Sequence, residues 1–325
     1  MPNFGLALSS EEHAPRDLVA YARMAEDAGF EFLSISDHYH PWIDAQGHSP
    51  FVWAVIGGIA ATTERIRLGT GVTCPTTRIH PAIIAHAAAT AGAMMPGRFF
   101  LGVGTGEKLN EHVVGARWPE WEVRAEMLEE AVGIIRQLWQ GDVQSHHGRH
   151  YTVENARIYD LPDPLPQIIL SGQGPRATEL AARIGDGFWG MGPKRELVEQ
   201  FDQAAGRGKP KYAQVTVSWG PDAAAARKLA HRIWPIAGIE GEAMQELPNQ
   251  RHFEQLASLV TEDQIAQSIT CGPDPEPILE AVGKFTDAGF DHIYFHQLGP
   301  DQEGFIEFAE RELLPRLGES RRPAA

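Results

Sequence analysis

The sequence is poor in cysteine, with only Cys74 and Cys271 among its 325 residues. Two cysteines cannot build a disulfide framework, and the absence of a Cys-x-x-Cys pair argues against a zinc site and against thiol redox chemistry. No window approaches the ~20 apolar residues of a membrane span, and the N-terminus lacks the pattern of an export signal. We therefore expect a cytoplasmic protein without a membrane partner.

Basic residues are also scarce. The chain has 28 Lys and Arg against 43 Asp and Glu, which gives a formal net charge of −15. Binding to nucleic acid needs a basic face, so this balance argues against a nucleic-acid partner. The length and the 43% hydrophobic content are those of a globular enzyme acting on a small molecule, and either one α/β barrel or two smaller domains would fit them.

Strand-like and helix-like segments alternate along the chain. The first unit is "NFGLAL", then "APRDLVAYARMAEDAG", then "FEFLSIS", and eight strand-like segments recur in this way. Because these strands are apolar on both faces, the pattern favours a closed parallel (β/α)8 TIM barrel over an open doubly wound sheet. Residues 142–166 break the rhythm as a hairpin insertion and residues 233–260 as a helical insertion. We predict one α/β domain over residues 1–325.

Active sites of such barrels lie at the C-terminal ends of the strands, so polar residues just after each strand are candidates. The segment "FLSISDHYHPW" ends a buried strand in an unusual cluster of Asp, His, Tyr and Trp side chains. The residues that follow the predicted strands are Asp37, His38, Tyr39, His40 and Trp42; Gly71, Val72 and Thr73; Thr105, Glu107 and Asn110; Ser171 to Gly174; Trp189 to Lys194; Trp219; and His296 and Gln297.

Two of these patterns have alternative interpretations. His38 and His40 form a His-x-His pair that would suit a metal, but the other strand ends supply no clear set of further ligands, so we predict no metal. The stretch "GVGTGE" evokes a dinucleotide-binding loop, yet it lacks the third glycine and places Glu107 where a phosphate would be repelled.

Glycines and tryptophans elsewhere allow simpler interpretations. "SGQGP", residues 171–175, precedes a helix whose N-terminal N–H groups and dipole can receive an anion, although such glycines also serve as plain turns. Trp139 and Trp234 fall near helix centres and are most simply core residues. Trp42 differs, because it lies beside the polar cluster and can form the wall of a pocket.

Several stretches resemble the bacterial luciferase-like superfamily. They are "SDHYHPW", "GTGV", "PTTRIHPAIIAHAAATAGAMMPGRFFLGVGTGEKLNE" and "IGDGFW". The resemblance is to the group that uses the deazaflavin coenzyme F-420, in particular the F-420-dependent glucose-6-phosphate dehydrogenases, and it runs from Phe4 to about Leu317. It implies a (β/α)8 barrel, commonly a homodimer, that binds the deazaflavin ring deep in the barrel with its phosphate near the surface.

The resemblance also implies roles for individual residues. The active-site His of the group falls on His38, its pocket Trp on Trp42 and its acid on Glu107. A bulge that supports the ring, often built with a non-prolyl cis peptide, falls at Gly71-Val72. The cofactor-binding residues implied in this way are Asp37, His38, Gly71, Val72, Thr105, Gly106, Glu107, Asn110, Ser171, Gly172, Gln173, Gly174 and Pro175.

The substrate side departs from the group. Lys194 is retained, but Met191 replaces a hydroxyl residue and Gln255 stands where a lysine is expected, so a phosphate would lose most of its counter-charge. This favours a secondary alcohol, a ketone or a less charged sugar, although other basic residues leave a sugar phosphate open. The predicted substrate pocket comprises His40, Trp42, Trp189, Met191, Lys194, Gln255 and His296.

The sequence therefore predicts an F-420-dependent oxidoreductase that moves a hydride between the deazaflavin and an alcohol or carbonyl substrate. A neutral His38 would take the hydroxyl proton, and the Glu107 carboxyl would deliver a proton or hydrogen bond to the reduced ring. Three alternatives remain open at this stage: an FMN-dependent monooxygenase of the same barrel, a non-catalytic barrel that binds deazaflavin, and a His-x-His metal hydrolase.

Overall fold

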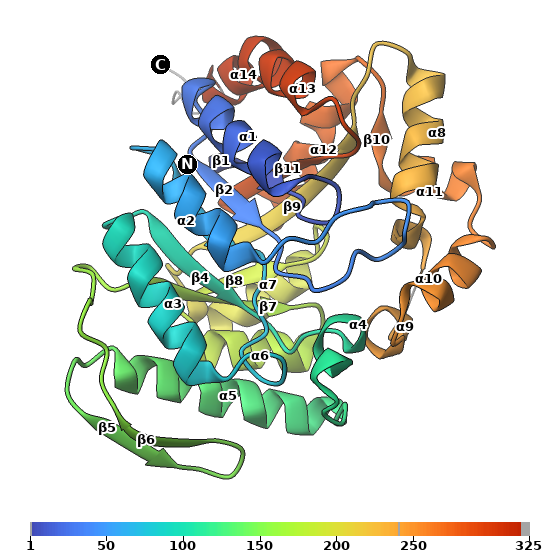
Figure 1. Ribbon diagram of the computed structural model, residues 1–325. Coiled ribbons are helices and arrows are strands. Elements are labelled where there is room, and N and C mark those ends of the chain that lie inside the picture. Colours follow the sequence, from blue (N-terminus) through green and yellow to red (C-terminus); the bar gives the residue numbers. More distant parts are fainter. Residues whose placement is uncertain (1, 240, 320–325) are drawn as a thin grey trace.

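Eight parallel strands close into a barrel in the computed structural model, which describes residues 2–239 and 241–319 (Figure 1). Position 240, in the predicted helical insertion, and the outermost ends of the predicted 1–325 domain lie outside the described residues. Each strand pairs with the next, and the last pairs with the first, so the predicted TIM barrel is confirmed. In spatial order the strands are β1 (Asn3–Leu8), β2 (Phe32–Ile35), β3 (Arg67–Thr70), β4 (Phe99–Val103), β7 (Gln167–Gly172), β8 (Gly187–Gly190), β9 (Lys211–Ser218) and β11 (His292–Gln297).

Helices form the outer layer of the barrel (Figure 1). The first of them, α1, begins at a proline, which suits the first turn of a helix, and buries Leu18, Ala22 and Ala25 at helical spacing. None of the helices in the described ranges is both long and apolar enough to cross a bilayer. The outer helices are α1 (Pro15–Asp27), α2 (Val52–Thr62), α3 (Pro81–Met94), α5 (Trp121–Leu138), α6 (Pro175–Ile184), α7 (Arg195–Phe201), α8 (Ala223–Ile233), α12 (Pro275–Ala288), α13 (Gln302–Phe308) and α14 (Leu314–Glu319).

Further elements interrupt the barrel pattern. The antiparallel hairpin of β5 (Gln144–His147) and β6 (Thr152–Ala156) lies within residues 142–166. Within residues 233–260 the chain forms α9 (Ala243–Glu246) and α10 (Gln250–Ala257), together with a short 3-10 turn at Pro235–Gly238. The chain also forms α4 (Lys108–Glu111), α11 (Glu262–Ser268) and the two-residue strand β10 (Thr270–Cys271), which pairs with β9 and was not predicted. The assignment of the chain to one domain stays a prediction.

Aromatic side chains fill the barrel interior below its mouth. Trp189 stacks on Tyr212 with ring centroids 5.2 Å apart, and its indole N–H donates a 2.8 Å hydrogen bond to the hydroxyl of Tyr294. A buried indole thereby gains the polar partner that it needs. This layer closes the barrel beneath the strand ends. Its members are Phe32, Phe100, Ile169, Trp189, Tyr212 and Tyr294.

The packing of neighbouring strands leaves no room for a side chain at Gly102. A Cβ at this position would overlap the backbone carbonyl oxygen of Thr70, and the Thr70 hydroxyl donates a 2.8 Å hydrogen bond to the Gly102 carbonyl. We expect Gly102→Ala to reduce the free energy of unfolding by about 1–3 kcal/mol or more, because the obstacle is backbone rather than a mobile side chain. Gly57→Ala, in α2 with open space around it, is the matched control and should be neutral or stabilising by about 0.5–1 kcal/mol. Equal chemical-denaturation midpoints for the two variants would contradict this account.

Candidate active site

A cavity of about 470 Å³ opens at the C-terminal ends of the barrel strands, where the strand-end rule places an active site. Polar side chains from β2, from β9 and from the segment directly after β1 share its walls with apolar side chains from the segment after α8. Ten of the predicted site residues line this cavity: His38, Trp42, Gly71, Val72, Glu107, Ser171, Gln173, Trp189, Met191 and His296.

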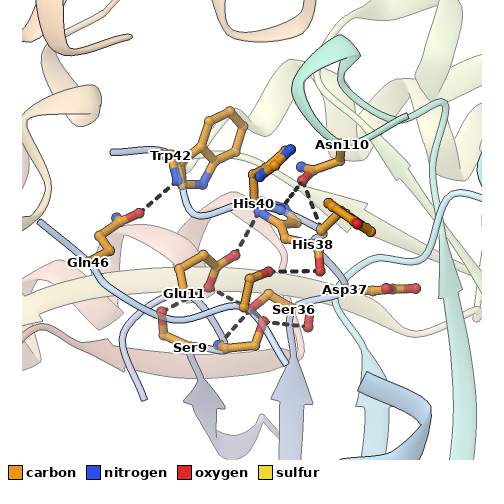
Figure 2. Close-up of polar contacts among 12 residues, drawn as sticks. Ser9, Glu11, Ser36, Asp37, His38, His40, Trp42, Gln46 and Asn110 are labelled. Carbon is orange, nitrogen blue, oxygen red and sulfur yellow. Dashed lines mark hydrogen bonds and ion pairs between the residues drawn. The ribbon is translucent and has the colours of Figure 1, made fainter. Parts of the chain in front are cut away.

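His38 forms an ion pair with Glu11 in the cavity wall. Its Nδ1 lies 2.9 Å from a carboxylate oxygen of Glu11, and the two side chains are 11% and 3% exposed (Figure 2). Burial opposes the charged imidazole, but the charge and hydrogen bond of Glu11 outweigh it and raise the pKa of His38 to about 9. Despite its burial, Glu11 has its pKa lowered to about 2 by the charge of His38 and by hydrogen bonds. At neutral pH the imidazole is therefore protonated, which differs from the neutral His38 expected from the sequence.

Serine hydroxyls hold Glu11 in place. Ser9 and Ser36 donate hydrogen bonds of 3.0 and 2.7 Å to the same oxygen of Glu11, which leaves the other oxygen facing His38 (Figure 2). Glu11 is not among the predicted site residues, because the predicted strand-end candidates begin after the second strand. The signal was present in "SSEEH", which directly follows β1.

Trp42 packs edge-on against His38, with ring centroids 5.1 Å apart. Its backbone N–H donates a 2.8 Å hydrogen bond to the side-chain oxygen of Gln46 (Figure 2). Its ring packs on Phe253 of α10. The indole is 8% exposed and lines the cavity. Trp42 thus restricts the position of the imidazole and forms an apolar surface beside it.

Asn110 and Asp37 lie behind the cavity wall and fix the loop that carries His38. The Asn110 side-chain oxygen accepts hydrogen bonds from the backbone N–H groups of Tyr39 and His40, at 2.9 and 3.0 Å. The Asp37 carboxylate accepts one hydrogen bond from Arg78 and one from Thr73, each at 2.8 Å. Both residues are almost fully buried and neither lines the cavity. Their direct contact with a cofactor stays a prediction.

The wall formed after β3 and β4 carries the predicted bulge. The peptide bond between Gly71 and Val72 is cis, as the resemblance implied, and both residues line the cavity. A Cβ at Gly71 would overlap the hydroxyl of Ser34, so the backbone itself forms the surface here. Thr105 and Gly106 precede Glu107, which lines the cavity at the start of α4.

The predicted phosphate-binding turn precedes α6. Ser171 and Gln173 line the cavity, whereas Gly172, Gly174 and Pro175 are outside its lining. Arg176, in the first turn of α6, is engaged elsewhere: its guanidinium lies 2.9 Å from Glu122 and 4.2 Å from the ring of Trp121. Phosphate binding at this turn stays a prediction.

Three predicted pocket residues do not line the cavity, and one residue that was interpreted as core does line it. Lys194, directly before α7, and Gln255, on α10, are exposed, and the ring of His40 packs on Tyr39. None of the three lines the cavity. Trp234 was interpreted as core but lines the cavity, with its ring 4.5 Å from that of His296. The physical reason is that α8 ends at Ile233, so Trp234 begins a loop rather than continuing a buried helix face.

The two histidines of the His-x-His pair have separate environments, since His38 pairs with Glu11 and His40 contacts Tyr39. Among the described residues, no group of three or more His, Cys, Asp and Glu side chains is arranged to hold a metal ion. The metal-hydrolase alternative therefore has no support in the described geometry.

The chain belongs to the luciferase-like monooxygenase family, whose sequence model matches residues 1–292. It is 37% identical over 326 residues to an F-420-dependent glucose-6-phosphate dehydrogenase of Microbacterium testaceum, covering 97% of each chain. It is also 37% identical over 327 residues to the F-420-dependent glucose-6-phosphate dehydrogenase of Mycobacterium tuberculosis, covering 96% of this chain and 97% of that one. Among solved structures, an F-420-dependent secondary alcohol dehydrogenase in complex with an F-420–acetone adduct matches with a TM-score of 0.89 and 29% identity, over 97% of this chain and 98% of the other.

Proposed function

We propose that this chain is an F-420-dependent dehydrogenase that transfers a hydride between the deazaflavin and an alcohol or carbonyl substrate. The observation that carries the proposal is the buried ion pair of His38 and Glu11, which lines the same cavity as Glu107 and the Gly71-Val72 peptide. The relatives that match nearly the whole chain are named as F-420-dependent dehydrogenases, which supports this cofactor over FMN.

The residues of the cavity fit a flat heteroaromatic cofactor. The Val72 side chain and the backbone of Gly71 offer one surface, and Ser171 and Gln173 offer polar groups at the end of β7. When bound, F-420 supplies an acceptor or donor for a hydride. We infer that Gly71, Val72, Ser171 and Gln173 contact the coenzyme, while Asn110 and Asp37 support it through the His38 loop.

His38 exchanges a proton with the substrate in this proposal. Because Nδ1 faces Glu11, Nε2 is the ring atom left for the substrate oxygen. With its pKa at about 9, His38 carries a proton at neutral pH, which suits protonation of a carbonyl that is being reduced. Oxidation of an alcohol needs the neutral imidazole, so its rate should rise with pH toward about 9.

Substitution Glu11→Gln should move this pH dependence. Without the carboxylate, burial of His38 is opposed only by the smaller contributions of the Glu107 and Asp37 charges, so the pKa of His38 should fall from about 9 toward its ordinary 6.5. In a plot of the initial rate of alcohol oxidation against pH, the rise in rate should therefore occur about 2 pH units lower than in the wild type. If the rate of the variant rises over the same pH range as that of the wild type, another group controls the rate.

The same variant tests the stability of the pair. His38 has a raised pKa, so its contribution is complete below 6.5 and is lost as pH rises through about 9. Glu11 has a lowered pKa, so its contribution is complete above 4.5 and is lost as pH falls toward about 2. The difference in unfolding free energy between wild type and Glu11→Gln should hence be largest between pH 4.5 and 6.5. Chemical denaturation across pH measures it.

Transfer of deuterium tests the reaction type. A secondary alcohol that carries deuterium on its carbinol carbon should reduce F-420, and mass spectrometry should find the deuterium in the reduced coenzyme. Reduced coenzyme that carries hydrogen from solvent instead would contradict direct hydride transfer. Protein without added alcohol is the control.

Assembly and location complete the proposal. We propose a cytoplasmic homodimer, in line with the resemblance and with the two free cysteines. Ile83 and Met94 of α3, 59% and 46% exposed, are apolar side chains that a partner copy would cover. Light scattering on the purified protein distinguishes a dimer from a monomer.

A further inference from the structure

Apolar side chains form the wall of the cavity that adjoins His38. Trp42, beside the imidazole, belongs to one cluster with Ile236 and Phe253, and Trp234 and Met244 pack against that cluster. Trp42, Trp234, Ile236 and Met244 all line the cavity. A substrate whose hydroxyl meets Nε2 of His38 would therefore have its carbon substituents beside apolar surface.

Basic side chains of the described residues do not line this cavity. None of the described residues that line the cavity is Lys or Arg, whereas Glu11 and Glu107 contribute carboxyl groups to it. Arg78 is bound to Asp37 and Glu111 behind the wall. Lys194 is exposed and outside the lining. The charge of protonated His38 is already matched by Glu11. A phosphate dianion in this cavity would therefore lose its hydration without gaining an unpaired counter-charge, which is strongly unfavourable.

Arg124 lies close behind the apolar wall, but its charge is also matched. Its guanidinium donates 3.2 Å hydrogen bonds to Glu246 and Gln245 of α9, and it lies 4.2 Å from the ring of Trp118. The Arg124 side chain is 2% exposed. It thus anchors the segment that carries Met244 and is unavailable to a ligand.

Polar groups contributed to the cavity by β9 and β11 are bonded to one another. The side-chain nitrogen of Gln214 lies 2.9 Å from the Thr216 hydroxyl and 3.1 Å from Nδ1 of His296. These contacts occupy groups that a sugar ring with several hydroxyls would otherwise use. A substrate with a single hydroxyl needs one polar partner in the cavity, and His38 provides it.

We propose that the cavity takes an uncharged alcohol with apolar substituents on its carbinol carbon, together with the corresponding ketone, and that it rejects sugar phosphates. This inference rests on the proposed F-420-dependent function. In the oxidation, the O–H proton passes to Nε2 of the neutral form of His38, the C–H bond breaks and its electron pair leaves as hydride to the coenzyme, and a C=O bond forms. The reduction of the ketone reverses each step.

Calorimetric titration tests the substrate class without requiring turnover. Cyclohexanol, cyclohexanone and glucose 6-phosphate would be titrated into the protein alone and into its complex with oxidised F-420. We expect both cyclic ligands to bind more tightly than glucose 6-phosphate, and cyclohexanol to exceed it in kcat/KM for bleaching of F-420 by at least about 100-fold. A preference for glucose 6-phosphate in either assay would overturn the inference.

Two variants connect the preference to the apolar wall. Trp234→Ala should lower kcat/KM for cyclohexanol by about tenfold or more with little change in F-420 affinity, whereas Trp53→Phe, on α2 away from the cavity, should change neither. Met244→Arg introduces a cation and should raise the affinity for glucose 6-phosphate while lowering that for cyclohexanone. If Trp234→Ala fails to fold, Met244→Arg still tests the role of the apolar wall. An unchanged preference of Met244→Arg between cyclohexanone and glucose 6-phosphate would overturn that role.

The remaining outcomes separate the two proposals. Tight binding of F-420 without turnover of cyclohexanol or cyclohexanone would overturn the substrate class and leave the cofactor in place. Failure to bind F-420 would overturn the proposed function, and the titrations of the protein alone would still rank the three ligands.

Discussion

Replacing His38 by alanine should reduce alcohol oxidation by about 10²–10⁴-fold. The imidazole is the proton acceptor beside the substrate in this account, and both its position and its pKa are set by Glu11. Binding of F-420 should persist, because the loop is fixed by Asn110 and Asp37 rather than by the His38 ring. Stopped-flow bleaching of F-420 and a fluorescence titration measure the two quantities separately.

His40→Ala is the matched control for that experiment. Its ring contacts Tyr39 and is outside the cavity lining, and only its backbone N–H bonds to Asn110. The control should keep nearly full activity. A His38→Ala variant as active as His40→Ala would remove His38 from the mechanism.

Replacing Glu107 by glutamine should impair turnover by about 10²-fold, with a much smaller effect on F-420 affinity. The carboxyl group lines the cavity and its charge contributes to the raised pKa of His38, so it lies within the same electrostatic environment. The amide keeps the size of the side chain and can still donate a hydrogen bond, but it cannot transfer a proton. Single-turnover bleaching of the F-420 complex isolates this step.

Glu120→Gln makes the same chemical change on the surface. Glu120 is exposed and its side chain makes no capping hydrogen bond at the start of α5. It should behave as wild type in turnover. Turnover and pH–rate curves of Glu107→Gln that match those of Glu120→Gln would exclude an acid role for Glu107.

Much of the architecture was predictable, because the alternation of apolar strand-like runs with helical patterns is repeated along the chain. All eight barrel strands follow from short apolar runs that alternate with helical patterns, as at Phe99–Val103 and Gln167–Gly172. The rule that sites lie at strand ends then placed His38, Glu107 and His296 in one cavity. The two-residue strand β10 escaped prediction, because two residues give no periodic signal.

The contacts between distant segments were beyond the sequence. Glu11 and His38 follow different strands, and only the closed barrel brings their side chains within 2.9 Å. Lys194 and Gln255 were placed in the pocket from a resemblance of residue types, but both side chains are exposed and lie outside the cavity lining. Trp234 is the reverse case: it was interpreted as a core residue, but α8 ends at Ile233 and Trp234 lines the cavity.

Cofactor choice is the central claim, and a competitive fluorescence titration of the purified protein with oxidised F-420 and with FMN tests it most directly. The account predicts saturable binding of F-420, which FMN does not displace at comparable concentration, followed by bleaching when a neutral secondary alcohol is added. Selective binding of FMN, with no response to F-420, would contradict the account and indicate a flavin monooxygenase.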